Sequence, residues 1–419
     1  MVTSIGGTVP DGFETMWGSI APIGRSSRSG GYLRQPWTSA ESELRAWFVE
    51  QSEARGLAVE GDGNGNLLAW WDLSSVERGS SVERSRDHAV LVGSHLDSVL
   101  DGGAYDGPLG VVSSFAAIDR LRERGVEPRR PVVVGAFVDE EGSRFGLACL
   151  GSRLATGATT RQKAAELRDP DGVFLPDAMV SAGFEPALGP AGWVDRVGCF
   201  VELHVEQGRD LVDRDVAVGL ASAIWPHGRY RFEFSGEANH AGTTRMEDRH
   251  DPMLSYAMTA LAAAKQARLA GQRATFGRLD VAPNGTNAIP SRVTAWLDAR
   301  CDTEESLASL VAEVERLGSE RAGRDGTSLS VTAESVSGAV TFDRDLTARL
   351  DAALGGGVPV IPTMAGHDAG ILASAGVPTA MMFVRNPTGV SHSPDEFAST
   401  EDCLAGVDAL ATVLAELVS

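Results

Sequence analysis

The sequence predicts an α/β protein in which a largely parallel sheet, covered by helices on both faces, is interrupted by a smaller domain. Three near-continuous apolar runs of strand length, AVLVGS (89–94), PVVVGAFV (131–138) and CFVEL (199–203), are typical of strands buried on both faces. A helical pattern at 109–125 separates the first two runs, and strands that alternate with helices indicate a parallel sheet. At 419 residues the chain exceeds one ordinary core, so we expect two domains.

The other elements of the larger domain follow from periodicity and from helix-ending residues. Residues 41–57 have the apolar spacing of an amphipathic helix, and NLLAWWDL near residue 70 has that of a strand. Gly125 stands where the C-cap of the 109–125 helix is expected. The α/β pattern resumes near the C-terminus with two helices, a strand and a closing helix, at 343–354, 366–376, 377–384 and 400–418.

The middle of the chain has a different character. Residues 224–236 alternate polar and apolar side chains, as a half-exposed strand does, and an Ala-rich helix is expected at 251–271. Two strands, a helix and a last strand are then predicted at 274–281, 292–300, 303–322 and 328–335. The order βαββαβ is that of the ferredoxin-like arrangement. We therefore expect a second domain at 218–335, inserted between two parts of the larger domain, 1–217 and 336–419.

Composition and charge exclude several classes of protein. Hydrophobic residues at 43% and charged residues at 22% are ordinary for a soluble globular protein. A net charge of -20 would repel nucleic acid and anionic membranes, so we expect neither as a partner. The four cysteines form no CxxC pair and are expected to be buried, reduced thiols. The sequence has no secretory signal pattern and no long apolar run, so we expect a cytoplasmic protein.

Side chains that can bind metals stand close after the predicted strands, in GSHLDS, AYDGP, DEEGSRFG, VELHVEQG and GVSHSPDEF. They are His95, Asp97, Asp106, Glu140, Glu141, His204 and His392. Because ligands gather beyond the carboxyl ends of the strands in open α/β sheets, we expect these side chains at one edge. Histidine and carboxylate ligands together suit Zn, Mn or Co, and a carboxylate can bridge two ions. Hydrolysis is therefore the leading hypothesis.

Individual roles can be argued from chemistry. Asp97, two residues after His95, can accept the second imidazole N–H and fix the tautomer of that ring. Asp106 lies in a Gly-rich loop and is the best candidate for a bridging ligand. Adjacent carboxylates repel unless a positive charge is near, so we expect Glu141 to bind metal and Glu140 to act as general base. The alternative for this pair is a solvated acidic turn.

The motifs GSHLDS, YDGPLGV, DEEGSRFG, ELHVEQG, NHAGTT, TNAIPSR, GHDAG and SHSP occur here in a recognisable order. In this, the chain resembles the di-metal amidohydrolases of the hydantoinase/carbamoylase type, which include allantoate amidohydrolase, N-carbamoyl-L-amino acid hydrolase and β-alanine synthase. The resemblance covers nearly the whole chain. It implies an aminopeptidase-like α/β/α catalytic domain, interrupted by the ferredoxin-like domain.

The resemblance also implies a ligand set and an assembly. One ion would be held by the residues matching His95, Asp106 and His204, and the other by those matching Asp106, Glu141 and His392, with Glu140 as the base. The two divalent ions would be Zn or Mn, with Co or Ni as alternatives. Family members look like homodimers joined through the inserted domain, here residues 218–335, which closes over the site and contributes residues to the partner's active site.

By the same resemblance, His240 in ANHAGTT polarises the scissile carbonyl, while Asn287 and Arg300 bind the carboxylate and ureido group of the substrate. Taken alone, these three residues would be interpreted as a surface His, a turn Asn and an exposed Arg. The resemblance further implies that Gln207 hydrogen-bonds the substrate. One departure stands out: Arg245 occupies a position where the family commonly has Pro, so a cation stands in the loop that follows His240.

His367 lies beside glycines at the start of a predicted helix, where backbone N–H groups can meet an anion, so we include it among the substrate-binding residues. The alternative is a histidine that merely neighbours a helix-capping Asp368.

The reaction that the resemblance implies is hydrolysis of the ureido (carbamoyl) group of a small carboxylic acid. Motifs such as SAIWPHGR and FVRNPTGVSHSP look most similar to chains assigned to allantoate, which would yield ureidoglycine, ammonia and carbon dioxide. N-carbamoyl-L-amino acids and then β-ureidopropionate are the next candidates. A di-metal aminopeptidase or carboxypeptidase would share the ligand set, and a non-catalytic binding protein is the remaining class. Such a binding protein would be expected to lack the base or one of the metal ligands. This chain has the candidate base and all of the candidate ligands.

Overall fold

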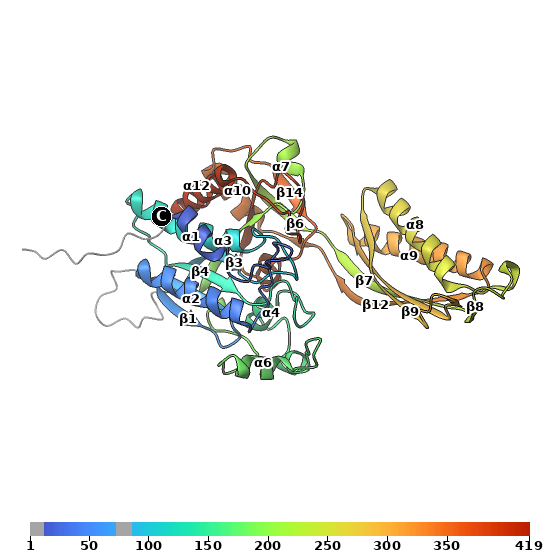
Figure 1. The fold of residues 1–419 in the computed structure, drawn as a ribbon. Helices are drawn as coiled ribbons and strands as arrows, with labels where there is room; N and C mark the ends of the chain where they lie inside the picture. The colour runs from blue at the N-terminus through green and yellow to red at the C-terminus, as the bar shows by residue number, and fades with distance from the viewer. Residues whose placement is uncertain (1–11, 73–85) are drawn as a thin grey trace, which may run out of the picture. The chain divides into compact units, whose positions relative to one another are not determined.

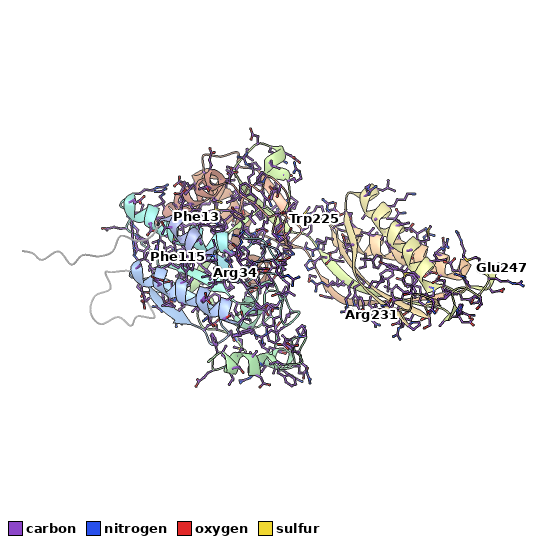
Figure 2. The ribbon with its side chains drawn as sticks, viewed as in Figure 1. Phe13, Arg34, Phe115, Trp225, Arg231 and Glu247 are labelled. Carbon is purple, nitrogen blue, oxygen red and sulfur yellow. The ribbon has the colours of Figure 1, made fainter. Side chains whose placement is uncertain are left out.

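The computed structural model describes residues 12–72 and 86–419 (Figure 1). The chain divides into two compact units. The larger consists of the residues up to Ser222 together with Thr341–Ser419, and the smaller is Ala223–Val340. Figure 2 labels Phe115 and Arg34 in the larger unit, where both side chains are almost fully buried.

The larger unit is built on a nine-stranded sheet with the order β1-β2-β4-β3-β5-β15-β6-β13, and β14 pairs with β6. Its centre is parallel, because β3 runs parallel to β4 and β5, and β5 runs parallel to β15. This confirms the predicted fold class. The strands are β1 (Ala58–Gly61), β2 (Leu67–Trp71), β3 (Ala89–His95), β4 (Val132–Phe137), β5 (Val197–Val205), β6 (Val218–Ile224), β13 (Val340–Thr341), β14 (Val360–Thr363) and β15 (Thr379–Val384).

Both faces of this sheet are buried, as the continuous apolar runs predicted. In β3, Val90 and Val92 pack into the main core, while Leu91 points to the opposite face and is equally buried. Helices α3 and α12 lie in the main core, and α11 contacts β5 and β15. The helices of this unit are α1 (Phe13–Ile20), α2 (Ser39–Ala54), α3 (Pro108–Glu123), α4 (Leu150–Ala155), α5 (Arg161–Ala165), α6 (Leu175–Ser181), α7 (Asp210–Asp213), α10 (Arg344–Ala353), α11 (Asp368–Ser374) and α12 (Thr400–Leu417).

Helix α3 is the buried centre of the larger unit. Pro108 begins the helix, a position where proline's missing N–H costs nothing. Phe115 packs against Phe48 and Trp47, with ring centroids 5.1 and 5.9 Å apart. At Gly110 a Cβ atom would lie 2.2 Å from the Leu203 carbonyl oxygen, so the absence of a side chain lets the helix sit directly on β5. This contact places the loop before α3 next to the end of β5.

The smaller unit has the element order βαββαβ and a four-stranded antiparallel sheet in the order β12-β7-β11-β9. Its elements are β7 (His227–Ser235), β8 (Asn239–His240), α8 (Pro252–Ala270), β9 (Arg273–Ala282), β10 (Ala288–Ile289), β11 (Arg292–Arg300), α9 (Glu304–Arg324) and β12 (Ser328–Ser337). One face of the sheet, including Phe232 and Phe234, packs with Leu307 and Val314 of α9. Short strands β8 and β10 pair with each other in a separate ribbon.

The structure differs from the expected domain limits by a few residues on each side. Val218, expected to open the inserted domain, begins β6, which pairs antiparallel with β15 in the large sheet. The physical reason is that β6 carries the apolar sequence VGLASAI, whose Leu220 and Ala221 are fully buried. At the other end, β12 extends to Ser337, beyond the expected limit at residue 335.

All four cysteines are buried and unpaired. In the described part of the chain, none of the helices combines the length and the apolar character needed to cross a bilayer.

Candidate active site

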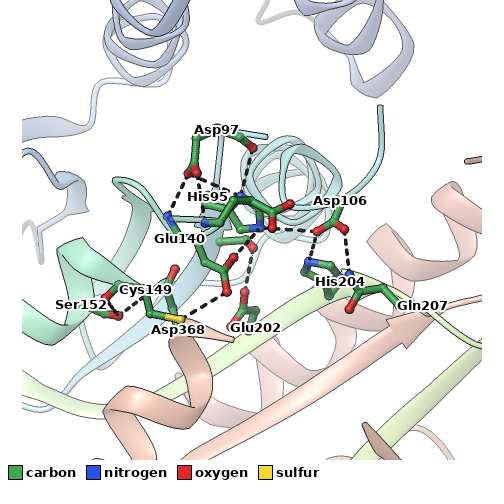
Figure 3. A network of polar contacts seen from close by, with 12 residues as sticks. His95, Asp97, Asp106, Glu140, Cys149, Ser152, Glu202, His204, Gln207 and Asp368 are labelled. Atoms are coloured by element: carbon green, nitrogen blue, oxygen red, sulfur yellow. Dashed lines mark hydrogen bonds and ion pairs between the residues drawn. The ribbon is translucent and has the colours of Figure 1, made fainter. Parts of the chain in front are cut away.

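The predicted metal-binding side chains lie beyond the carboxyl ends of the central strands of the larger unit. His95 is the last residue of β3, and Glu140 follows the end of β4 by three residues. His204 is the penultimate residue of β5. His392 is carried by the loop that follows β15. Figure 3 shows His95, Glu140 and His204 converging with Asp106 from these separate segments.

The first group of candidate ligands is formed by His95, Asp106 and His204. Asp106 Oδ1 lies 3.1 Å from His204 Nε2 and 3.6 Å from His95 Nε2. All three side chains are buried, and their ligand atoms lie within 4.8 Å of one another. This spacing can accommodate one small cation.

The second group is formed by Asp106, Glu141 and His392. His392 Nε2 lies 3.4 Å from Asp106 Oδ2 and 3.4 Å from Glu141 Oε2. The ligand atoms of this group also lie within 4.8 Å of one another. Asp106 therefore faces one group with Oδ1 and the other with Oδ2.

Unpaired buried atoms show that these residues fit divalent ions. Among the described residues, Nε2 of His95, Nε2 of His204 and Oε1 of Glu141 are buried without a hydrogen-bond partner. The Nδ1 atoms of the two rings face backbone carbonyls, at 3.2 Å from Asp97 O for His95 and 2.9 Å from Val205 O for His204. A proton on each Nδ1 leaves the lone pair of Nε2 directed at Asp106, which is the arrangement that metal coordination requires.

Asp97 has a different role from the one expected. Its carboxylate is 3.6 Å from His95 Nδ1, too far for a hydrogen bond, and it is the backbone oxygen of Asp97 that lies closer to the ring. The carboxylate instead accepts the backbone N–H groups of Glu140 and Glu141, each at 3.1 Å. The sequence spacing suggested the ring contact, whereas the fold uses Asp97 to hold the backbone of the glutamate pair.

The electrostatics of the site favour a cation. Burial raises the pKa of Glu140 well above its usual range. Burial and the nearby Asp106 raise the pKa of Glu141 to about 7. Burial also opposes ionisation of Asp106, but contacts with His204, His392 and His95 together hold its pKa well below the usual range. A divalent cation would relieve the mutual repulsion of these carboxylates.

Glu140 lies beside the two ligand groups without belonging to either. Its Oε2 is 3.8 Å from His95 Nε2. Its Oε1 accepts a hydrogen bond from the thiol of Cys149, with an S to O distance of 3.3 Å. The side chain is 7% exposed, so a proton taken up here would be shielded from bulk water.

Gln207 and His367 also lie at this edge of the sheet. Gln207 Nε2 donates to Asp106 Oδ2 at 2.7 Å, while its Oε1 is buried without a partner among the described residues. The His367 ring lies edge-on to that of His204, with centroids 4.6 Å apart. Burial lowers the pKa of His367 well below its usual range, with a further contribution from His204, so this ring is neutral.

His240, Asn287 and Arg300 belong to the smaller unit. The exposed His240 ring accepts two backbone N–H groups at Nδ1, from Gly242 at 3.0 Å and from Thr243 at 3.1 Å. Nδ1 must therefore be the unprotonated nitrogen in this loop, which leaves Nε2–H as a donor. The sequence alone did not indicate this tautomer.

Within the smaller unit, His240 and Asn287 are neighbours and Arg300 is separate from them. Ala241 N donates to Asn287 O at 2.9 Å, next to the β8 to β10 pairing. Arg300 is the last residue of β11 and forms a two-point ion pair with Asp298, at 2.8 and 3.2 Å. With β11 running for nine residues from Arg292, Arg300 lies about 25 Å along the strand from the end that adjoins β10.

Several residues around the ligands were not predicted. Ser391 and Glu396 form hydrogen bonds with Tyr105 and Asp106. Asp368 accepts a 2.5 Å hydrogen bond from the hydroxyl of Ser152. The segment SHSPDEF offered a signal for two of them, because Ser391 and Glu396 lie within four residues of His392.

Residues 91–416 match the family described as Peptidase family M20/M25/M40. The chain belongs to this family. It is 35% identical to an N-carbamoyl-L-amino acid amidohydrolase of Geobacillus stearothermophilus over 95% of this chain and 96% of that protein. It is 31% identical to an allantoate amidohydrolase of Escherichia coli over 93% of each chain.

A solved structure agrees with this M20 assignment. A hydantoinase/carbamoylase family amidase from Burkholderia vietnamiensis superposes with a TM-score of 0.84 at 26% identity, covering 99% of this chain and 100% of that chain. The resemblance inferred from the motifs is thus confirmed. This M20 protein is an amidohydrolase, a hydrolase of carbon–nitrogen bonds. Metal binding is general in the M20 family, and the described residues include two groups that could hold such ions.

Proposed function

We propose that this protein hydrolyses the ureido group of a small carboxylic acid at a site for two divalent ions, with zinc or manganese as the occupants. The observation that carries the proposal is the position of Asp106, whose two carboxylate oxygens face different ligand groups. That is the arrangement of a bridging ligand. The names of the relatives from Geobacillus stearothermophilus and Escherichia coli support ureido acids as the substrate class.

Bound ions would lower the pKa of water toward neutrality and polarise the carbonyl under attack. Glu140 is the general base: its carboxylate takes a proton from the attacking water and later donates it to the leaving nitrogen. The raised pKa of Glu140 favours holding the proton between the two steps, and the positive charge of bound ions would favour the ionised form that starts the reaction. Asp97 keeps the backbone of Glu140 and Glu141 fixed while the proton moves.

The proposed reaction consumes one water. Its oxygen forms a bond to the carbamoyl carbon, the bond between that carbon and the nitrogen of the acid breaks, and this nitrogen receives the proton held by Glu140. The amine leaves, and the released carbamate decomposes to ammonia and carbon dioxide. With allantoate as substrate, the amine is ureidoglycine.

His240 is the proposed donor to the oxygen that becomes negative during attack. The two backbone N–H groups at Nδ1 support this role, because they favour the tautomer with a proton on Nε2. A fixed donor needs no reorganisation when charge develops, and removing one such donor commonly lowers kcat about 100- to 1,000-fold. Gln207, Asn287, Arg300 and His367 are the proposed substrate contacts.

Allantoate is the substrate we favour, on the motifs SAIWPHGR and FVRNPTGVSHSP. N-carbamoyl-L-amino acids are the second candidate, favoured by the 35% identity to the Geobacillus stearothermophilus enzyme. Steady-state kinetics with allantoate, N-carbamoyl-L-amino acids, N-carbamoyl-β-alanine and dipeptides, in added Zn²⁺ or Mn²⁺, separates them. A tenfold higher kcat/KM for a carbamoyl amino acid rejects allantoate, and cleavage of dipeptides alone rejects the ureido class.

We also propose a homodimer formed through the smaller unit. Helix α8 exposes an apolar stripe of Leu254, Met258, Leu261 and Leu269, the last two at 67% and 72% exposure, which is unusual for a free surface. The wide separation of Arg300 from His240 supports the same conclusion, because one small substrate cannot touch both within a subunit. Light scattering should give twice the chain mass, and replacing Leu261 and Leu269 with Glu should give monomers. A monomeric unsubstituted protein would refute this proposal.

A further inference from the structure

Glu396 is a buried carboxylate that contacts the segment of the bridging ligand candidate Asp106. It is 4% exposed and lies four residues after His392. One oxygen, Oε1, accepts the backbone N–H groups of Tyr105 at 2.7 Å and of Asp106 at 2.9 Å. Glu396 thus ties together two segments that lie about 290 residues apart in the sequence and that each carry a candidate ligand.

Ser391 extends this contact to the carboxylate of Asp106. Its hydroxyl oxygen lies 2.9 Å from Glu396 Oε2 and 3.0 Å from Asp106 Oδ2. A hydroxyl has one hydrogen, so Ser391 can donate to only one of these carboxylates at a time. When Asp106 Oδ2 binds an ion, the hydrogen is available to Glu396, and the link between the two segments is retained.

The Gly-rich loop before Asp106 is shaped around the same carboxyl group. A Cβ atom at Gly103 would lie 2.4 Å from both Cδ and Oε1 of Glu396. The backbone of Gly103 is not in the left-handed region, so the conformation itself would accept alanine. The glycine is required here because Glu396 fills the space where a side chain would be.

We propose that Glu396 is a positioning residue that fixes Asp106 relative to His392, so that one carboxylate can serve both ligand groups. This inference rests on the two-ion site proposed above. Backbone N–H groups held by a rigid acceptor fix where the Asp106 carboxylate can point, as outer partners of metal ligands do elsewhere. Loss of the contact would release the ions without unfolding the protein.

The test measures the rate at which zinc is transferred from the full-length, zinc-loaded enzyme to a chromogenic chelator. The temperature is kept well below that of unfolding. Glu396→Ala removes the acceptor, and Gly103→Ala displaces it while keeping the carboxylate. Both should release zinc about 10- to 100-fold faster than the unsubstituted enzyme. Glu396→Gln retains an oxygen for the two N–H groups and should restore slow release.

Asp169→Ala is the matched control, because it also removes a carboxylate that accepts two backbone N–H groups. Asp169 accepts two backbone N–H groups on one oxygen, from Asp171 at 3.1 Å and Val173 at 2.9 Å, and an arginine contact on the other, but it contacts no candidate ligand. Its zinc release should equal that of the unsubstituted enzyme. Equal acceleration in Asp169→Ala and Glu396→Ala would overturn the proposal, because the effect would be a general consequence of losing a carboxylate that accepts backbone N–H groups.

The variant Asp106→Asn distinguishes a failure of the proposed role of Glu396 from a failure of the proposed two-ion site. If Asp106→Asn retains zinc as firmly as the unsubstituted enzyme, the proposed two-ion site is wrong. If Asp106→Asn loses zinc while Glu396→Ala and Gly103→Ala retain it, the site stands and the role of Glu396 is refuted. Should Glu396→Ala fail to fold, Gly103→Ala alone decides between these outcomes.

Discussion

Replacing Gly110 with alanine should destabilise the protein, although alanine is the better helix former. In a helix interior the substitution gains about 1 kcal/mol from propensity alone. At Gly110 of α3, however, the new Cβ would lie 2.2 Å from the Leu203 backbone oxygen and 2.7 Å from Ser94 Cβ, and a backbone oxygen cannot rotate away. Overpacking of this kind costs about 1–3 kcal/mol. The net change should lie between about zero and 2 kcal/mol of lost stability.

The matched control is Gly18→Ala in α1, where, apart from its chain neighbours and the backbone of its own helix, no atom lies within 4 Å of the new Cβ. This variant should gain about 1 kcal/mol, so the two variants should differ by about 1–3 kcal/mol. Denaturant unfolding of the chelator-treated protein measures the difference without the contribution of bound metal. Because α3 begins two residues after Asp106, we also expect Gly110→Ala to lose activity, and a 1 Å displacement can lower it about 100-fold. Equal stability of the two variants would show that α3 is not seated on β5 as described.

Three further outcomes are expected. Glu140→Gln should abolish turnover while metal content by elemental analysis stays near that of the unsubstituted enzyme, and undiminished activity would refute its role as base. In chelator-treated protein, stability should fall as pH rises from about 5 to 8, because Glu141 has a folded pKa of about 7 against an ordinary 4.5 and therefore holds more protons folded than unfolded. Glu141→Gln should reduce that dependence in unfolding experiments at several pH values, although Asp368, whose pKa burial raises to about 8, still contributes. An unchanged slope would contradict the assignment. Native protein should resist iodoacetamide at pH 8, since burial raises the pKa of Cys301 to about 11 and of Cys403 to about 12, and rapid labelling would contradict the burial.

The sequence predicted the ligand cluster well because strand ends constrain where side chains go. His95, Glu140 and His204 each stand at or just after an apolar run, and parallel strands bring their carboxyl ends to one edge. Periodicity also located α3 and α8 to within two residues. The fold class followed from the same runs.

Contacts that depend on loop geometry could not be predicted in this way. The sequence spacing of Asp97 suggested a contact with His95, but loop conformation directs its carboxylate to the backbone of Glu140. The role of Glu396 depends on its contact with the loop that carries Asp106, about 290 residues away in the sequence. A local sequence pattern cannot predict such a contact. The expected domain limit at residue 218 placed the β6 residues in the smaller domain, and only the pairing of β6 with β15 decided its sheet.

The ribbon of β8 and β10 has a consequence for any attempt to change substrate range by directed evolution. His240 is paired with Ala288, the residue after Asn287, so the proposed carbonyl donor and a proposed substrate contact share one two-stranded ribbon. We therefore expect substitutions at Asn287 to displace the imidazole of His240 as well as to change the substrate contact. Selectivity and rate would therefore change together at this ribbon, whereas Arg300, at the far end of β11, can be varied without displacing His240.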